Sequence, residues 1–489
     1  MDFPDSELFS VLQEFNPWWS GQAAGDLPDW ERSAFRPIWK WVSDGQTKRG
    51  LVLTGARQVG KTTLYRQVIR RLVQEGFPAH RVLYATFDHP ILKLAGIERT
   101  LEAWNVLFPP PAPGEDARRI LFLDEVQYAG GWATWLKHRV DFGSDLKVAV
   151  TGSAAPLDAA GVESGVGRWE TIPLPTLSFG EFLRLHRVRL PVLDAGDTPP
   201  PLHALFDADD GQRARLAQVG KGLEPHFYDY LLRGGFPEPS QAPDLSRCQR
   251  LLREDIIDKV LKRDLTALYG VRKVLEAEKI FLYLCYHDGG VLRMPQLTQD
   301  LTGVSRATAQ NLLDLFEATH LIYRLKPMGY GKQILRASDK VYLADAALPG
   351  AMLLLGRRLL EQPERLGAAV ETAFFKHVYT RFYGDSLRFS YWQDPKNRKL
   401  EVDLVAEVGD RVVPFEVKHR DTALGLKQLK GMRLFLEEFG VDRGYMIGRR
   451  WEDLRVLDAT SARRGSEGRP LDAKILVVPA ALACWCLSG

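Results

Sequence analysis

The stretch GARQVGKT, residues 55–62, constrains the fold of this chain more than any other feature. It has the spacing G-x-x-x-x-G-K-[ST] and lies between the apolar run GLVLT and the helix-like run TTLYRQVIRRLVQ. In this context the glycines let backbone amides curl around phosphate groups, and the N-terminus of the helix adds its dipole. The flanking runs favour a phosphate-binding loop over the alternative, a glycine-containing turn before an ordinary helix.

The residues of this loop have distinct expected roles. Lys61 is expected to reach the β- and γ-phosphates of ATP, and the Thr62 hydroxyl is expected to bind Mg²⁺. ATP and Mg²⁺ are therefore the expected cofactors. The other residues expected to contact the nucleotide are Gly55, Gln58, Gly60 and Thr63.

An acidic pair follows further along the chain. The apolar run ILFLDE ends in Asp124 and Glu125. Because the carboxyl ends of parallel strands meet the ligand crevice, Asp124 is expected to hold Mg²⁺ directly or through water. Glu125 is expected to polarise the attacking water. A buried strand followed by surface acids would have the same sequence, but the upstream loop favours the catalytic interpretation.

Two more residues are candidates for the same site. Ser153 ends the run KVAVTGS, where a polar group can sense the γ-phosphate, although a simple Thr-Gly turn has the same sequence. Arg168 is a candidate arginine finger that acts on the ATP of a neighbouring subunit, which predicts a homo-oligomer. The alternative for Arg168 is a solvated or ion-paired side chain.

The order of apolar runs predicts several domains, since 489 residues are too many for one ordinary core. Strand-like runs alternate with helical patterns up to the Pro- and Asp-rich stretch 189–212, as is typical of a parallel α/β sheet. The expected divisions are an N-terminal extension at 1–34, an α/β phosphate-loop domain at 35–188, a helical linker region at 189–270, a winged-helix-like domain at 271–345 and a C-terminal α/β domain at 346–489.

The winged helix is predicted from three helical patterns followed by LIYRLKPMGYGKQ. Ser305 is placed to cap the third helix. The exposed face of this helix would carry Arg306, Gln310 and Asn311, side chains that can contact bases or phosphates. Winged helices also bind proteins, so DNA and a protein are both open as partners. The residues expected to point inward are Leu312, Leu315 and Phe316.

Charge and cysteine content restrict the partners and the compartment. The 65 basic and 62 acidic residues give a net charge of +3, so a nucleic-acid surface would have to come from local clustering. The four cysteines have neither zinc-site spacing nor a disulfide pattern, which fits a reducing cytoplasm. We find no signal-peptide pattern and no long uncharged apolar run, so we expect a cytoplasmic protein without a membrane segment.

Residues 401–418, EVDLVAEVGDRVVPFEVK, predict a β-hairpin near the C-terminus. A two-residue turn at Gly409-Asp410 would place Asp403 opposite Glu416. Alternation would put both acids on one face with Lys418. Directly opposed carboxylates repel unless a cation or a lysine lies between them. A divalent ion needs this arrangement, so the hairpin predicts a metal site. The other face would be apolar, with Val402, Leu404, Ala406, Val413, Phe415 and Val417.

The order of these parts resembles the bacterial and archaeal AAA+ type ATPases that carry a C-terminal domain of unknown function 4143. The resemblance rests on TGARQVGKTTL, ILFLDEVQ, VTGSAAPL, LPTLSFGEF, LLRGGFPEP, VYLADAAL, EVDLV and PFEVK, and it spans about residues 35–420. It implies a P-loop AAA+ type ATPase domain, while the biological role of such proteins is uncertain. The N-terminal run EFNPWW, residues 14–19, is expected to pack against that domain.

The C-terminal acids resemble the active site of the restriction-endonuclease-like superfamily, with its PD-(D/E)xK pattern. Asp403 and Glu416-x-Lys418 carry the resemblance, although the proline that names the motif is absent. It implies that the two carboxylates hold Mg²⁺ and that Lys418 orients water. It also implies Glu371 as a further acidic ligand and Gln428 beside the site. Basic residues that could contact phosphates nearby are Lys418, Arg420, Lys427, Lys430 and Arg433.

Two functions are open at this point. The first is an ATP-hydrolysing, DNA-binding protein that remodels or processes DNA, with or without metal-dependent cleavage. The second is a nucleotide-switched regulator or scaffold that acts on a protein partner and keeps a vestigial nuclease-like domain. In the second, Glu416 and Lys418 form only a surface ion pair, and Pro414 in the second strand could shift the register assumed for the first.

Overall fold

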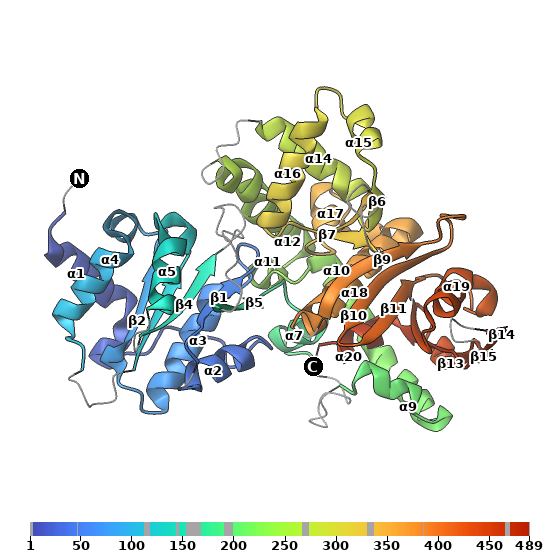
Figure 1. Ribbon diagram of the computed structural model, residues 1–489, viewed down its shortest axis with the longest axis horizontal. Coiled ribbons are helices and arrows are strands. Elements are labelled where there is room, and N and C mark those ends of the chain that lie inside the picture. Colours follow the sequence, from blue (N-terminus) through green and yellow to red (C-terminus); the bar gives the residue numbers. More distant parts are fainter. Residues whose placement is uncertain are drawn as a thin grey trace. The chain divides into compact units, whose positions relative to one another are not determined.

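Chain contacts divide the protein into two units (Figure 1). The first comprises Met1–Leu174 with Ala318–His320, and the second Pro175–Glu317 with Leu321–Gly489. The computed structural model describes residues 3–45, 47–111, 118–142, 146–152, 168–189, 199–266, 273–329, 337–384, 386–464 and 470–488. The boundary expected after residue 188 lies earlier, because Phe179 and Phe182 of helix α7 (Phe179–Leu185) are buried in the core of the second unit.

The first unit contains a five-stranded parallel sheet in the order β2-β3-β4-β1-β5. The predicted alternation of strands and helices is confirmed. Figure 1 shows α2 and α3 on one side of this sheet and α4 and α5 on the other. The elements are α1 (Asp5–Phe15), α2 (Phe35–Ser43), β1 (Gly50–Thr54), α3 (Lys61–Gln74), β2 (Val82–Thr86), α4 (Pro90–Leu107), β3 (Arg119–Asp124), α5 (Trp132–Asp141), β4 (Leu146–Gly152) and β5 (Trp169–Pro173).

The N-terminal residues are part of this first unit. Leu8 and Leu12 on α1 are fully buried in the same apolar core as Leu83 of β2 and Leu121 of β3. Residues 1–34 are therefore not a separate extension, because their apolar face completes the core of the sheet domain. The run 14–19 packs against β2, as the sequence predicted.

A nine-stranded mixed sheet organises the second unit, in the order β13-β16-β12-β11-β10-β9-β7-β8-β6. Strands β7 and β9 pair in parallel, with Lys326 beside Ser390. The segments 271–345 and 346–489, expected as two domains, therefore share one sheet. The strands are β6 (Gly290–Leu292), β7 (Ile322–Pro327), β8 (Asp339–Leu343), β9 (Ser386–Gln393), β10 (Glu401–Val408), β11 (Arg411–Val417), β12 (Arg443–Gly448), β13 (Arg455–Asp458) and β16 (Lys474–Pro479), with a separate pair β14 (Ser461–Arg464) and β15 (Pro470–Leu471).

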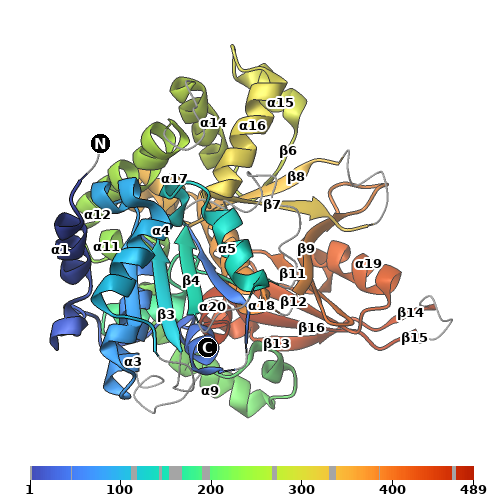
Figure 2. The same ribbon diagram turned by 60° about the vertical axis from the view of Figure 1, so that its left-hand side comes forward.

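Helices cover both faces of this sheet. One apolar core joins it to α18 and α20, and another joins it to α19. Figure 2 shows α14, α15 and α16 close to β6, β7 and β8. The helices are α9 (Asp210–Gly220), α10 (Glu224–Arg233), α11 (Pro237–Ser240), α12 (Leu245–Leu251), a π-helix (Leu252–Asp264), α14 (Val274–Tyr286), α15 (Met294–Asp300), α16 (Arg306–Ala318), α17 (Leu348–Met352), α18 (Pro363–Phe382), α19 (Lys430–Phe439) and α20 (Ala480–Cys486).

Helix α16 begins where the sequence predicted. The amide of Thr308 donates to the Ser305 hydroxyl at 3.1 Å, which is an N-cap. Leu312 and Phe316 are buried as expected, but Leu313 is buried where Leu315 was expected, and Leu315 is only half-buried. The buried stripe is therefore shifted slightly around the helix axis.

A buried ion pair explains three of the sequence motifs. Asp345 Oδ2 lies 3.1 Å from Lys376 Nζ and accepts hydrogen bonds from the Thr176 hydroxyl (2.6 Å) and the Gly235 amide (3.0 Å). Gly235 tolerates no side chain, since a Cβ there would lie 2.6 Å from the carbonyl oxygen of Leu177. The motifs LPTLSFGEF, LLRGGFPEP and VYLADAAL thus meet at one buried point that holds the second unit together.

Across the described ranges, no helix is both long and apolar enough to cross a membrane. All four cysteines are buried and free.

Candidate functional sites

The phosphate-binding loop joins β1 to α3. A Cβ on Gly55 would lie 2.2 Å from the carbonyl oxygen of Leu174, so only glycine fits there. Gly60 has φ of 98°, a backbone conformation that favours glycine. Gln58 also has positive φ, at 59°, and its side-chain oxygen is buried without a hydrogen-bond partner among the described residues. The loop is thus held in a tight curve with strained backbone where the sequence predicted it.

Lys61 folds back over this loop. Its ammonium group donates to the carbonyl oxygens of Gly55 and Ala56, each at 2.9 Å, and its side chain is buried. Thr62 and Thr63 follow in the first turn of α3 and are half-buried. The helix N-terminus and a lysine therefore lie next to the same loop, which is the arrangement that holds phosphate.

The structure brings Thr62 and Asp124 together, although β4 separates β3 from β1, the strand that precedes the loop and α3. The Thr62 hydroxyl donates to Asp124 Oδ2 at 2.5 Å, and the Tyr84 hydroxyl donates to the same oxygen at 2.7 Å. Asp124 Oδ1 accepts from the Thr151 hydroxyl and from the Glu125 amide at 3.2 Å. The carboxylate is 1% exposed. A hydroxyl and a carboxylate oxygen in contact are ligands that Mg²⁺ prefers, so these residues fit that ion.

Glu125 follows in a left-handed conformation, with φ of 50°. Its amide donates to the Thr151 hydroxyl at 3.0 Å, and its carboxylate accepts from the side-chain amide of Gln127. Sequence reasoning missed Tyr84, Thr151 and Gln127. The positions of Tyr84 and Thr151 on strands next to β3 were the available signal.

The roles predicted for Ser153 and Arg168 at the ATP site are not seen in the described structure. Ser153 lies outside the described residues. Arg168 forms an ion pair with Asp141, with 2.7 Å between Nε and Oδ1, in line with the alternative that the sequence left open. Its role as an arginine finger stays a prediction.

The C-terminal hairpin has the predicted register. Val408 pairs with Arg411, and Leu404 pairs with Phe415. Of the six residues predicted for the apolar face, all but Val402 pack in or against one core. Val402 lies in another core, because a register shift lies between Val402 and Val405 where β10 pairs with β9. Val402 and Val405 pack into the core beside α19, while Leu404 packs into the core beside α18. Both faces of the sheet are therefore covered.

Lys340, which the sequence did not single out, lies between two of the expected metal ligands. Lys340 Nζ on β8 is 2.8 Å from Asp403 Oδ1 and 2.7 Å from Glu371 Oε1. Asp403 Oδ2 accepts from the Val417 amide at 2.8 Å, and Glu371 Oε1 also accepts from the Tyr342 hydroxyl at 2.8 Å. Lys340 and Asp403 are each 4% exposed. In the sequence, Lys340 and Asp403 stand out only as charged residues within largely apolar strands.

Glu416 pairs instead with Lys418, at 3.1 Å between Oε1 and Nζ, and its other oxygen is buried without a hydrogen-bond partner in the described part of the chain. Burial raises the pKa of Glu416 to about 7, against the attraction of Lys418. Burial also raises the pKa of Glu371 to about 7, with Asp403 adding to the effect. For Asp403, burial raises the pKa, but Lys340 and Lys418 outweigh it and hold the pKa below its ordinary value.

These acids do not fit a divalent ion as they lie. Within the described ranges, no group of three or more His, Cys, Asp or Glu side chains is arranged to hold a metal. The ammonium of Lys340 already contacts both Glu371 and Asp403. Gln428 is exposed, and its side-chain oxygen accepts from the Gly425 amide at 3.1 Å. Arg420 and Lys430 are exposed, Arg433 is half-buried, and the side chain of Lys427 lies outside the described residues.

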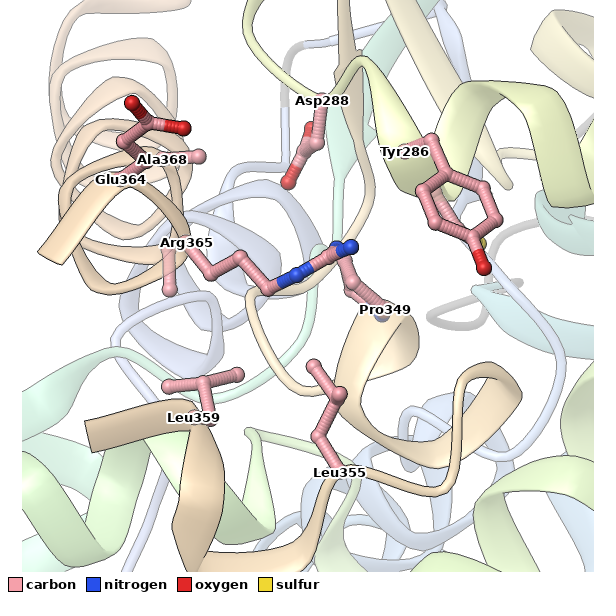
Figure 3. A pocket seen from close by; sticks show the side chains of 10 residues that line it. Tyr286, Asp288, Pro349, Leu355, Leu359, Glu364, Arg365 and Ala368 are labelled. Carbon is pink, nitrogen blue, oxygen red and sulfur yellow. The ribbon is translucent and has the colours of Figure 1, made fainter. Parts of the chain in front are cut away.

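Two hollows flank the beginning of α18. The larger, of about 460 Å³, is lined by Glu371 and Lys418 and has Arg420 and Arg449 at its wall. Figure 3 shows the smaller, of about 170 Å³, in which Arg365 extends between Asp288 and Tyr286. The guanidinium carbon of Arg365 lies 5.0 Å from the centre of the Tyr286 ring. The acid cluster around Glu371 is therefore next to a hollow that both basic and acidic side chains line.

Three family models match parts of the chain. Residues 47–183 match the AAA domain family, and residues 366–463 match a domain of unknown function, DUF4143. The chain carries an AAA-type ATPase domain and a DUF4143 domain. A third match, to the domain of unknown function DUF8612, covers residues 224–359 and so spans both the expected linker and the expected winged helix. The AAA domain implies nucleotide binding and ATPase activity, as the sequence predicted.

Relatives of similar length have no established role. The chain is 22% identical over 424 residues to an uncharacterized protein of Methanocaldococcus jannaschii, covering 84% of this chain and 83% of that protein. It is 26% identical over 380 residues to the uncharacterized protein Rv2008c of Mycobacterium tuberculosis, covering 76% and 70% of the two chains.

Solved structures give a distant likeness. Aquifex aeolicus DnaA bound to AMPPCP has a TM-score of 0.24 and 15% identity, covering 58% of this chain and 85% of that chain. Drosophila ORC bound to DNA has a TM-score of 0.27 and 16% identity, covering 72% and 94%. At these scores the likeness carries no argument about this protein.

Proposed function

We propose that the protein hydrolyses ATP and uses the cycle to remodel or process DNA. The contact between Thr62 and Asp124 beside the phosphate-binding loop carries the ATPase part of the proposal. Thr62 and Asp124 would hold Mg²⁺, which neutralises phosphate charge when bound. Lys61 would move from the loop carbonyls to the β- and γ-phosphates. Glu125 would accept a proton from the attacking water, with Gln127 fixing its carboxylate.

Two features of the second unit support DNA as the partner. Arg306, Gln310 and Asn311 are exposed on α16, which follows a helix-turn-helix order with β7 and β8 behind it. The exposed Arg420 in the hollow next to Glu371 could contact a phosphate backbone, while Arg449 of the same hollow already pairs with Asp421 at 2.8 Å. On this proposal, 271–345 acts as a winged helix and 346–489 as a restriction-endonuclease-like module.

Cleavage of DNA requires a change at the acid cluster. A divalent ion at Asp403 and Glu371 would have to displace the ammonium of Lys340, which contacts both. The nuclease part of the proposal is therefore conditional on movement of β8, the strand that carries Lys340.

The contacts of Lys340 also favour the second candidate, a nucleotide-switched scaffold with a vestigial nuclease-like domain. A buried lysine paired with both acids completes the charge balance without a metal. This candidate predicts slow ATP turnover that DNA does not alter, and no cleavage.

One experiment separates the two candidates and tests the ATP site. ATP turnover is measured with and without linear, forked and four-way DNA, and strand cleavage in Mg²⁺ or Mn²⁺ is recorded from the same samples. Lys61→Ala and Glu125→Gln should abolish turnover, while Lys48→Ala, at an exposed lysine, should not. Unchanged turnover in both site variants would overturn the ATPase assignment.

The DNA response then decides the partner. Stimulation by DNA supports the first candidate, and cleavage that Asp403→Ala abolishes adds the nuclease activity. Turnover that does not respond to any DNA would support the second candidate, the nucleotide-switched scaffold.

A further inference from the structure

Strand β2 is an edge strand of the first sheet. The run EFNPWW lies along its open edge, where a further strand could otherwise pair. The Asn16 side chain accepts from the Tyr84 amide at 2.7 Å and donates to the Tyr84 carbonyl at 2.9 Å. The indole nitrogens of Trp18 and Trp19 both donate to the Val82 carbonyl, at 3.2 and 2.9 Å. Asn16 is fully buried, so these bonds do not compete with water.

The amide of Asn16 suits this position for a chemical reason. One planar group supplies both an acceptor and a donor, so it can pair with the N–H and the C=O of the same residue, as a neighbouring strand would. An aspartate would keep the acceptor but would place a carboxylate against the Tyr84 carbonyl. The backbone of Tyr84 is therefore fixed from outside the sheet.

The side chain of the same tyrosine reaches the ATP site. Its hydroxyl donates to Asp124 Oδ2 at 2.7 Å, the oxygen that also accepts from Thr62. Tyr84 is 1% exposed, so this hydrogen bond to the carboxylate is shielded from water.

We infer that Tyr84 is a positioning residue of the ATP site, and that residues 14–19 set its position through Asn16. Tyr84 holds the Asp124 carboxylate toward Thr62, where both would bind the metal of a metal–nucleotide complex. The inference rests on the proposed function, because it assigns a role within the same site. It also gives the N-terminal run a function that the sequence alone did not supply.

The test is Tyr84→Phe, which keeps the ring and removes the hydroxyl. We expect the Mg²⁺ concentration for half-maximal ATP binding to rise about tenfold, the effect of losing one hydrogen bond to a charged group. Nucleotide affinity without Mg²⁺ should not change, since Tyr84 acts through Asp124. The matched control is Tyr65→Phe, because the Tyr65 hydroxyl donates to the Val150 carbonyl at 2.9 Å and not to the carboxylate.

Asn16→Asp and Asn16→Ala test the outer contact. Both should raise the Mg²⁺ requirement in the same direction as Tyr84→Phe and should speed hydrogen exchange at the Tyr84 amide. A Mg²⁺ requirement equal to wild type in Tyr84→Phe would overturn the inference. Mg²⁺-dependent ATP binding without turnover in wild type would overturn the ATPase proposal and leave the inference to be judged on binding. A wild-type protein that binds no nucleotide would overturn both.

Discussion

Asp124 and Asp403 are both buried carboxylates on strands, but the two units treat their charges differently. Asp124 in the first unit accepts hydrogen bonds from three hydroxyls and an amide, all neutral donors. Asp403 in the second unit contacts the ammonium of Lys340. Neutral donors orient a carboxylate and keep its charge for an incoming cation, whereas a buried ammonium neutralises it. An acidic motif therefore predicts a metal site only when no internal cation already contacts the acids.

The largest expected effect is on turnover at the first site. Asp124→Asn keeps the shape and removes the charge, so ATP turnover should fall at least about a hundredfold, since the charge that holds the metal is lost. Asp29→Asn, at an exposed acid of the same unit, should behave as wild type. Steady-state ATP hydrolysis at saturating Mg²⁺ is the measurement. If turnover in Asp124→Asn is close to that of wild type, Asp124 does not hold the metal, and the proposed difference between Asp124 and Asp403 is wrong.

Lys340→Met tests the internal cation of the second site. It leaves Glu371 and Asp403 buried without their ammonium, and we expect a loss of about 3–5 kcal/mol of unfolding free energy near pH 8. The loss should be smaller near pH 5, because Glu371, with its pKa of about 7, is then protonated. Urea denaturation, with hydrogen exchange in β8 and β10 to localise the effect, measures both.

The control for this variant is Lys326→Met on the neighbouring strand. Lys326 pairs with Asp339 at 2.6 Å but is 52% exposed, so its loss should cost about 0–1 kcal/mol. Equal effects from the two lysines would show that the buried pair has no special weight.

Asp288 allows a pH test with a smaller effect. Burial raises its pKa from 3.8 to about 7, and its partners are the Leu343 amide and the Thr372 hydroxyl. A raised folded-state pKa gives stability that is full below the unfolded pKa and is lost as the pH rises through about 7. Asp288→Asn removes this loss, so its stability relative to wild type should increase by about 2–3 kcal/mol from pH 5 to pH 8, since about two pH units of the loss lie above pH 5.

The readout for Asp288→Asn is the midpoint of urea denaturation at each pH. A difference from wild type that is constant across pH would mean that Asp288 is ionised in the folded protein at all of these pH values. Burial would then not raise the pKa of Asp288 into this pH range.

The smallest effect concerns the neutral donor of the second cluster. Tyr342→Phe removes the hydroxyl that donates to Glu371 Oε1, but Lys340 still contacts that oxygen. We expect a loss of about 1 kcal/mol in unfolding free energy. A loss as large as that of Lys340→Met would mean that hydrogen bonding, and not charge, organises this cluster.

Local patterns predicted the first unit well. The loop at 55–62 follows from a motif whose geometry is local to a strand–loop–helix unit. The contact of Asp124 with Thr62, 62 residues apart, follows because the carboxyl ends of parallel strands meet at one edge of the sheet. The hairpin register at Val408 and Arg411 also followed, because a two-residue turn fixes it.

Contacts between distant segments that carry no known motif could not be predicted from the sequence. Lys340 and Asp403 are 63 residues apart and meet only because β7 pairs with β9 and joins two parts of the chain in one sheet. Asn16 and Tyr84 meet because β2 happens to be the edge strand. The face of Val402 was missed because a local irregularity in β10 breaks the alternation on which the prediction relied.

Mn²⁺ binding in the presence of a non-hydrolysable ATP analogue, without DNA, tests most directly whether Asp124 or Asp403 belongs to a metal site. The bound Mn²⁺ is detected by electron paramagnetic resonance. We predict one nucleotide-dependent Mn²⁺ that Asp124→Asn abolishes and Asp403→Ala leaves in place. Mn²⁺ that persists in Asp124→Asn and disappears in Asp403→Ala would contradict the account.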